Sequence, residues 1–203
     1  MIINWNNYYS FSEALSEETC DKIISLGDNF KAGTVSVNTE PGRNQLVQHT
    51  VRNNKEQRVS EQWLYDLIWP YMITANLKAG WNYKIEASEE LHICQYKKGE
   101  FYDWHIDGRA DTLSTYTEKE VGNNQFLLGR VRKLSLIAIL NNEFKGGELE
   151  LIEYESETFN IIKPDMKKGS IIIFPSSQEH RVTPVLEGCR YSLVGLFLGP
   201  PLT

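Results

Sequence analysis

Cysteine is scarce in this chain of 203 residues, and its three copies, Cys20, Cys94 and Cys189, stand far apart. An odd number of widely spaced cysteines argues against a disulfide framework and against a thiolate metal cluster. The N-terminus also lacks a basic segment followed by an apolar stretch and a small-residue cleavage site, so no secretory signal is visible. We therefore expect a reduced, cytoplasmic protein.

An excess of positive charge and long apolar runs are missing as well. The chain carries 21 Lys and Arg against 27 Asp and Glu, and no basic cluster of the kind that binds phosphate backbones, which argues against a nucleic-acid partner. No run approaches the roughly eighteen apolar residues of a membrane span, so no membrane association is expected. The length and the 41% hydrophobic content fit one soluble globular domain over residues 1–203.

The N-terminal part, residues 1–80, is expected to hold the helices. After a short strand, one helix is predicted to start at an N-cap, Ser16, and a second covers 60–80, where apolar residues recur at helical spacing. Pro70 is expected to kink or divide that second helix. The polar stretch 28–58 reads as a long surface loop, with short strands within it as an open alternative. Loops of such length often act as lids over active sites, and a mobile surface excursion is the other interpretation.

From residue 83 onward, short apolar segments alternate with turn residues. The segments are 83–87, 90–96, 100–106, 134–140, 148–152, 170–174 and 190–198. Many short strands in the second part of the chain, with helices gathered in the first, predict a mainly β protein. We expect a jelly-roll core over 83–200, buttressed on one side by the N-terminal α-helices.

Two stretches carry candidate metal ligands. His105 and Asp107 are separated by one residue, so on a strand both side chains point to the same face. His180, just after the apolar run 171–174, offers a second imidazole. Two histidines and one carboxylate leave open positions on a metal, which is the ligand set of non-haem Fe(II) oxygenases. We predict these three residues as metal ligands of an enzyme.

An arginine follows the second histidine by ten residues. Arg190 opens an apolar strand pattern, and Ser192 lies on the same face of that strand. A planar guanidinium with a hydroxyl beside it suits bidentate capture of a carboxylate. The remaining histidines, His49 and His92, have no partners at ligand spacing and are expected to be structural or surface residues.

The order of these motifs resembles a known family. The chain reads Tyr-x2-Gly-x2-Tyr-x2-His-x-Asp from Tyr96, then Gly-Gly-Glu-Leu, then Phe-Pro-Ser-Ser, then the late histidine and arginine. This set resembles the 2-oxoglutarate- and Fe(II)-dependent dioxygenases, and within them the prolyl 4-hydroxylase-like branch with the PKHD-type hydroxylases. The resemblance covers roughly residues 85–198.

That resemblance implies a double-stranded β-helix and the cofactors Fe(II), 2-oxoglutarate and dioxygen, with ascorbate as a candidate reductant. It implies hydroxylation of an unactivated C–H bond of a prolyl or other peptidyl residue, with release of succinate and CO2. Arg190 would pair with the far carboxylate of 2-oxoglutarate. Tyr96 would help hold this cosubstrate, and Tyr102 would lie near the substrate.

At one place the chain departs from its relatives. Ile139 stands where relatives carry a tyrosine that serves the cosubstrate, so a hydroxyl contact is expected from Ser135, Ser192 or Tyr96 instead. The polar stretch 108–132 is a candidate substrate loop. Its possible substrate contacts are Arg109, Tyr116 and Arg130.

Three alternatives remain open. The same chemistry could act on a free amino acid, a nucleobase or a small metabolite. A non-catalytic, cupin-like module could bind a metal or small ligand, although such a module would not need Arg190 as an anchor. A structural or interaction protein could carry the motifs by chance. The substrate partner is thus a peptide, a protein or a small molecule, and the sequence does not predict an oligomeric state.

Overall fold

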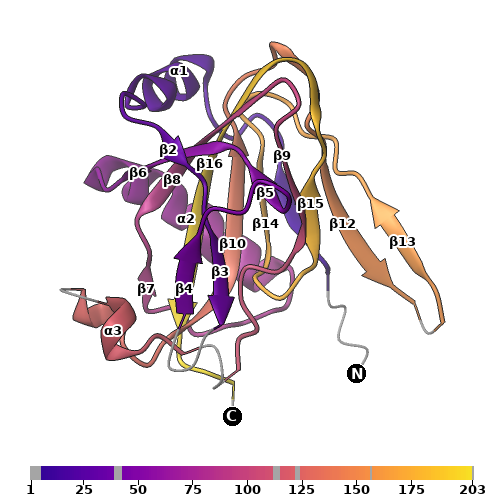
Figure 1. Cartoon of the computed structure of the whole chain (residues 1–203). Helices are drawn as coiled ribbons and strands as arrows, with labels where there is room; N and C mark the ends of the chain where they lie inside the picture. Colours follow the sequence, from indigo (N-terminus) through magenta and orange to yellow (C-terminus); the bar gives the residue numbers. More distant parts are fainter. Residues whose placement is uncertain (1–5, 39–42, 112–114, 122–123, 156, 203) are drawn as a thin grey trace.

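The computed structural model describes residues 6–38, 43–111, 115–121, 124–155 and 157–202 (Figure 1). Its strands are β1 (Tyr9–Phe11), β2 (Lys31–Ala32), β3 (Val35–Asn38), β4 (Arg43–Leu46), β5 (Arg52–Asn53), β6 (Lys55–Val59), β7 (Ala87–Ser88), β8 (Leu91–Lys97), β9 (Phe101–His105), β10 (Val131–Ile139), β11 (Phe144–Gly146), β12 (Leu149–Tyr154), β13 (Phe159–Ile162), β14 (Ile171–Pro175), β15 (His180–Val182) and β16 (Val185–Gly199). Its helices are α1 (Glu17–Ser25), α2 (Gln62–Lys78), α3 (Glu118–Val121) and the short 3-10 helix η2 (Gln125–Leu127).

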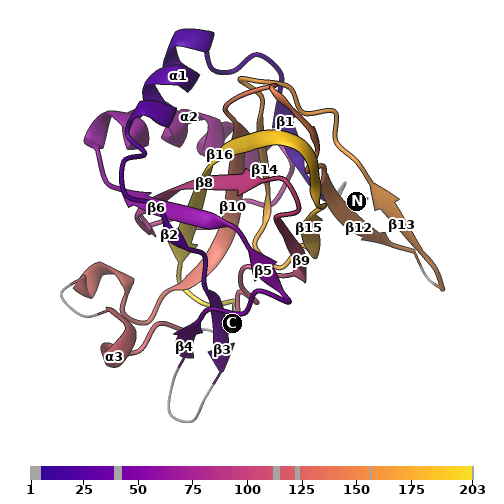
Figure 2. The same ribbon diagram turned by 45° about the horizontal axis from the view of Figure 1, so that its top comes forward.

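Antiparallel pairing builds two main sheets from these strands. Within the described residues, the larger sheet has nine strands, in the order β1-β14-β10-β16-β8-β6-β2, with β7 and β11 also paired to β16. The smaller sheet has five strands, in the order β13-β12-β15-β9-β5, and β3 pairs with β4 as a separate hairpin. Both views show the smaller sheet on one side of the larger one and the helices α1 and α2 on the other (Figures 1 and 2).

Alternation along the central strands gives each face of the larger sheet its own core. Leu134 and Leu136 of β10 pack with Leu64 and Ile68 of α2, and all four are fully buried. Ile137, the residue after Leu136 on β10, packs in a different cluster that includes residues of β12. Burying a side chain of this size stabilises the fold by about 1.5–3 kcal/mol. This arrangement is the jelly roll with flanking helices that the sequence predicted.

The two larger helices confirm most of the sequence prediction. Ser16 caps α1 and accepts a hydrogen bond from the backbone N–H of Thr19 at 3.2 Å. The second helix, α2, is continuous from Gln62 to Lys78 with Pro70 inside it, so the expectation that this proline divides the helix is wrong. The buried face of α2, which packs on the sheet on both sides of Pro70, offsets the backbone hydrogen bond that proline cannot donate.

The segment 28–58 corrects another expectation. It contains β2 to β6, and β6 pairs with β8 in the larger sheet over its whole length. The short strands that were an open alternative are therefore present, and the long surface loop is not; residues 39–42 lie outside the described part. The inward position of β6 holds Glu56, which is only 8% exposed. A charged residue at that position removes the apolar alternation by which strands are recognised in sequence.

Strand prediction was good for the long strands and poor for the short ones. The predicted segments overlap β8, β9, β10, β12, β14 and β16, whereas 83–87 meets β7 only at its last residue. The segments of β11, β13 and β15 were not predicted. β11 and β15 have three residues each, too few to show a period.

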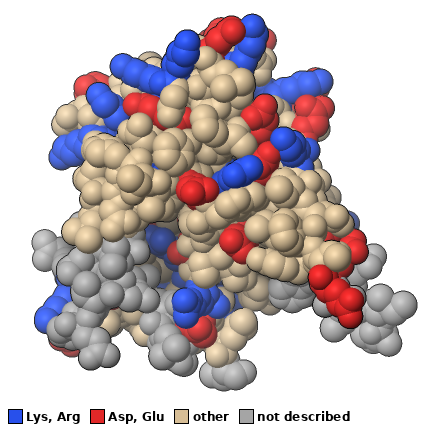
Figure 3. All heavy atoms as spheres, turned by 45° about the vertical axis from the view of Figure 1, so that its right-hand side comes forward, with Lys and Arg blue, Asp and Glu red and all other residues tan. Residues whose placement is uncertain are grey.

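The surface carries mixed charge where it is visible. On the face in Figure 3, Lys and Arg side chains are interspersed with Asp and Glu side chains. Several oppositely charged side chains of the described residues lie close together: Lys168 Nζ lies 2.7 Å from Asp21 Oδ1, and Lys145 Nζ lies 2.7 Å from Glu187 Oε2. Within the described residues, no helix is both long and apolar enough to cross a membrane.

Candidate active site

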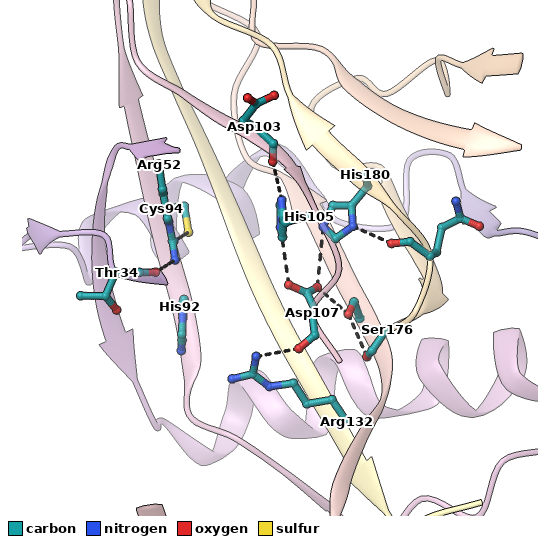
Figure 4. Close-up of polar contacts among 12 residues, drawn as sticks. Thr34, Arg52, His92, Cys94, Asp103, His105, Asp107, Arg132, Ser176 and His180 are labelled. Atoms are coloured by element: carbon teal, nitrogen blue, oxygen red, sulfur yellow. Dashed lines mark hydrogen bonds and ion pairs between the residues drawn. The ribbon is translucent and has the colours of Figure 1, made fainter. Parts of the chain in front are cut away.

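Strand register brings the two predicted histidines together. β9 and β15 are antiparallel neighbours in the smaller sheet, and His105 lies directly opposite His180. Their ring centroids are 4.2 Å apart. Asp107 follows two residues after His105, and its backbone N–H donates to the carbonyl of Ser176 at 2.9 Å. The candidate ligand atoms of the three residues all lie within 4.8 Å of one another (Figure 4).

Backbone carbonyls fix the ring orientation and the tautomer of each imidazole. His105 Nδ1 lies 2.7 Å from the carbonyl of Asp103, and His180 Nδ1 lies 2.9 Å from that of Gln178. A carbonyl only accepts, so each Nδ1 carries a proton and each Nε2 keeps its lone pair. The two Nε2 atoms lie 3.6 and 3.7 Å from the Asp107 carboxylate oxygens. Ligands about 2.1 Å from a metal sit about 3 Å apart, so the three residues fit a metal ion.

Ionisation of the cluster also suits a metal. Burial alone would raise the pKa of Asp107, but the imidazoles of His180 and His105 and the guanidinium of Arg132 hold that pKa well below its usual range. Burial lowers the pKa of His180 to about 4. At neutral pH the carboxylate is therefore charged and the imidazole neutral, which are the protonation states of metal ligands.

A shell of hydrogen bonds holds the carboxylate in place. Ser135 Oγ donates to Asp107 Oδ2 at 2.6 Å and lies 3.0 Å from Ser176 Oγ. Arg132 donates from Nη1 to the Asp107 carbonyl at 2.9 Å. Its Nε and Nη2 donate to the two carboxylate oxygens of Glu89 at 2.5 and 2.9 Å. The roles of Arg132 and Glu89 were not predicted, because nothing in their spacing relates them to the motif. Ser135 as a cosubstrate contact stays a prediction.

Arg190 is 1% exposed and lies on β16, directly opposite Tyr96 of β8. Its Nη1 donates to Ser192 Oγ at 3.0 Å, and its guanidinium carbon lies 5.4 Å from the centre of the Tyr96 ring. Nε and Nη2 have no hydrogen-bond partner in the part of the chain that is described, and burial lowers the pKa of the guanidinium. A buried charge with free donors is costly unless an anion accepts from them, so this site fits the carboxylate of 2-oxoglutarate.

A cavity of about 290 Å³ lies between the sheets and reaches the metal cluster. Tyr96 and Tyr102 line it, and their contacts with cosubstrate and substrate stay predictions. The Tyr102 ring stacks on His105 with 3.5 Å between centroids, and burial raises the pKa of this phenol to about 12. Predicted site residues that are not among those lining this cavity include Arg109, which is exposed, and Arg190 and Ser192, which are buried.

Residues 112–114 and 122–123 of the predicted substrate loop lie outside the described residues. Of the other contacts predicted in that loop, Tyr116 donates its hydroxyl to Glu89 at 2.5 Å, and Arg130 pairs with Glu86 at 3.0 Å. Their contact with substrate stays a prediction.

The cavity has a polar wall that the sequence did not reveal. Arg52, Glu56 and His92 all line it. Arg52 donates to the Glu56 carboxylate at 2.6 Å and lies over the Tyr102 ring, 4.7 Å from its centre. The segment 28–58 therefore supplies wall residues of the cavity.

Comparison with known proteins agrees with this geometry. The model of the 2OG-Fe(II) oxygenase superfamily matches residues 91–198, more than half of the chain. A PKHD-type hydroxylase of Synechococcus sp. (strain CC9605) is 32% identical over 113 residues, which are 55% of this chain and 42% of the relative. The chain thus matches less than half the length of that relative.

Solved structures show the same fold at low sequence identity. A prolyl-4-hydroxylase of Pseudomonas putida is 18% identical, with 94% of this chain and 91% of the other covered and a TM-score of 0.63. A prolyl hydroxylase of Trichoplax adhaerens, in complex with a peptide fragment of the hypoxia inducible factor oxygen degradation domain, is 18% identical, with 96% and 84% covered and a TM-score of 0.66.

The predicted cofactors are those that the family implies: Fe(II), 2-oxoglutarate and dioxygen. The region matched by the family model contains His105, Asp107, His180 and Arg190. The predicted family is confirmed, and the chain belongs to the 2OG-Fe(II) oxygenase superfamily.

Proposed function

We propose that the chain hydroxylates an unactivated C–H bond of a prolyl or other peptidyl residue. His105, Asp107 and His180 hold Fe(II), and Arg190 anchors 2-oxoglutarate. Bound together, iron and 2-oxoglutarate supply the oxidising chemistry: one oxygen atom of dioxygen goes to the substrate and the other to succinate, with loss of CO2. The observation that carries the proposal is the cluster itself, whose two imidazoles are turned with Nε2 toward one carboxylate.

The protein contributes orientation. The carbonyls behind His105 and His180 fix the ring tautomers, and the hydroxyl of Ser135 holds one oxygen of Asp107, so the ligand atoms are arranged before the metal binds. Arg190 and the hydroxyl of Ser192 offer donors to the far carboxylate of the cosubstrate. Val194 and Leu196 form an apolar part of the cavity lining, which disfavours water near the reacting groups.

A peptide substrate is favoured by the relatives. The curated relatives are PKHD-type hydroxylases, and the Trichoplax enzyme of the same fold was solved with a peptide. A reduced compartment, the cytoplasm, remains our proposed location, because Cys20, Cys94 and Cys189 are all free.

An anaerobic titration with Fe(II) and then 2-oxoglutarate tests the cofactor site. The chelate has a weak visible charge-transfer band, which we expect in the wild type and in His49→Ala but not in His105→Ala. His49 is exposed and so is the matched control. Iron binding without a band would instead favour a metal-binding module.

Succinate release tests the substrate. Proline-containing peptides are expected to stimulate it above the uncoupled rate. Stimulation by free amino acids or small metabolites, but not by peptides, would overturn the peptidyl assignment and leave the cofactor site standing.

A further inference from the structure

A second polar cluster lies in the cavity apart from the metal ligands. Alternation along β8 turns His92 and Cys94 to the cavity, whereas Leu91 and Ile93 belong to the core on the helix side. Figure 4 shows Arg52, Cys94 and His92 on one side of the view and the metal cluster on the other. The cluster of Arg52, Glu56 and His92 is therefore placed to meet a ligand in the same cavity as the metal site.

The guanidinium of Arg52 makes its hydrogen bonds within the protein. Its Nε donates to Asn54 Oδ1 at 2.8 Å, its Nη1 to the carbonyl of Thr34 at 2.8 Å, and its Nη2 to Glu56 Oε2 at 2.6 Å. Burial would raise the pKa of Glu56, but the contact with His92 and the charge of Arg52 lower it to about 2. The carboxylate is thus ionised at neutral pH, and an ionised carboxylate only accepts hydrogen bonds.

This carboxylate orients His92. The Nδ1 atom of His92 lies 3.5 Å from Glu56 Oε2, an arrangement that favours the ring proton on Nδ1. In a neutral imidazole with a proton on Nδ1, Nε2 is an acceptor. Nε2 is buried, and in the described parts of the chain it has no hydrogen-bond partner.

The apolar surroundings of His92 Nε2 favour a ligand that donates a hydrogen bond to this atom. Val194 lies directly opposite His92 across the β8–β16 pair, and it lines the cavity together with Ile137 and Leu196. An unsatisfied acceptor beside apolar side chains costs free energy, which a ligand recovers when it brings an N–H or O–H group. A ligand with only apolar or acceptor groups at this place leaves the acceptor unsatisfied.

We infer that His92 is a specificity-determining residue, whose Nε2 accepts a hydrogen bond from an amide N–H of the peptide substrate. The inference rests on the proposed function and narrows its substrate class to peptides with a free N–H beside the residue that is hydroxylated. Sites built around one such hydrogen bond reject analogues that lack the donor. His92 is thus more than the structural or surface residue that its sequence position indicated.

Imidazole 15N NMR of the Zn(II)-loaded full chain tests the acceptor directly. His92 is expected with its proton on Nδ1 alone. A proton on Nε2, or on both nitrogens, would overturn the inference. Glu56→Gln should shift the tautomer balance, because a neutral amide no longer requires a donor from Nδ1.

Two probes that differ in a single N–H test recognition. N-acetylproline methylamide carries the donor, and N-acetylproline dimethylamide lacks it. We expect kcat/KM, followed by succinate release, to favour the methylamide by about tenfold or more, the effect of one buried hydrogen bond. The preference should vanish in His92→Leu, persist in part in His92→Gln, whose amide oxygen can accept, and remain intact in His49→Leu.

The outcomes separate this inference from the proposed function. An equal response of the wild type to both probes, including no response to either, overturns the role of His92. The same holds if His92→Leu keeps the wild-type preference. The Fe(II) and 2-oxoglutarate band does not depend on the probes: with the band present the proposed cofactor site stands, and without it the proposed function fails first.

Discussion

Replacing Arg190 with methionine is expected to remove 2-oxoglutarate binding while barely changing the stability of the apoprotein. Substituting buried charges by apolar residues of similar volume is often neutral or stabilising by about 1–4 kcal/mol. Against that gain stand the bond to Ser192, about 1.5–3 kcal/mol, and the contact with the Tyr96 ring, about 0.5–2 kcal/mol. These contributions nearly cancel, so the free energy of unfolding should change by less than about 2 kcal/mol.

Cosubstrate affinity should change far more. Truncating one partner of a buried, hydrogen-bonded charge pair costs about 2–5 kcal/mol, which weakens 2-oxoglutarate binding by about 30-fold to several thousandfold. The charge-transfer titration gives Kd, and urea unfolding of the apoprotein gives stability. Thermal unfolding adds a third readout, since 2-oxoglutarate at a hundred times its Kd stabilises the wild type by about 2.7 kcal/mol and should not stabilise the variant.

The control is Arg130→Met, which alters a surface pair outside the cavity and should leave 2-oxoglutarate binding unchanged. Two results would refute the reasoning for Arg190. An unchanged Kd in Arg190→Met would remove this residue from the cosubstrate site. A loss of about 3–5 kcal/mol of apoprotein stability would show that the guanidinium has a partner within the fold, because that is the cost of breaking a well-paired buried charge.

Three further predictions concern the support around the site. The pKa of Glu56 is about 2 in the folded protein against 4.5 in the unfolded chain. Its ionisation therefore contributes roughly 3 kcal/mol to the free energy of unfolding; this contribution is complete above pH 4.5 and is lost as the pH falls through 2. Urea unfolding at several pH values should show this loss of stability in the wild type and not in Glu56→Gln. Glu89→Gln should weaken metal binding about tenfold or more in a Mn(II) titration, because Glu89 holds the arginine that supports the metal-site backbone, whereas Glu86→Gln, at an exposed pair, should not. Gly188→Ala should lower the free energy of unfolding in urea more than Gly99→Ala does. A Cβ at Gly188 would lie 2.1 Å from a carbonyl oxygen, whereas the space at Gly99 is open. Gly99→Ala therefore bears only the positive-φ strain of about 1–2 kcal/mol.

Equal effects would contradict these three arguments. If both glycine variants lost the same stability, backbone strain alone would decide and the close approach would be irrelevant. If Glu86→Gln and Glu89→Gln weakened metal binding equally, the burial of the Glu89–Arg132 pair would not support the metal site. A wild-type acid slope that survives in Glu56→Gln would assign the proton uptake to another carboxyl.

The cluster of His105, Asp107 and His180 was predictable because its signal is local. One intervening residue places the first two side chains on one strand face, and the late histidine follows an apolar strand that is easily recognised. The N-cap of α1, Ser16, was predictable for the same reason. The ring orientations were not, because they depend on the carbonyls of Asp103 and Gln178, which any residue could supply.

The wall of the cavity escaped prediction because its contacts are long-range. Glu56 meets His92 only after β6 has paired with β8, and Arg132 reaches Glu89 across 43 positions of sequence. Charges that neutralise each other in the fold look like ordinary solvated residues in the sequence. A charged segment was therefore predicted as a loop.

These failures have a common pattern that helps to locate a site. On β6, β8, β10 and β16, inward positions that would hold apolar residues in a plain core hold Glu56, His92, Ser135 and Arg190. A buried polar side chain is stable only with a partner. Glu56 and Ser135 find theirs within the protein, whereas His92 and Arg190 keep unsatisfied nitrogens in the described structure. Because local rules are broken mainly where function requires it, we take His92 as the candidate contact for substrate and Arg190 as the candidate contact for cosubstrate.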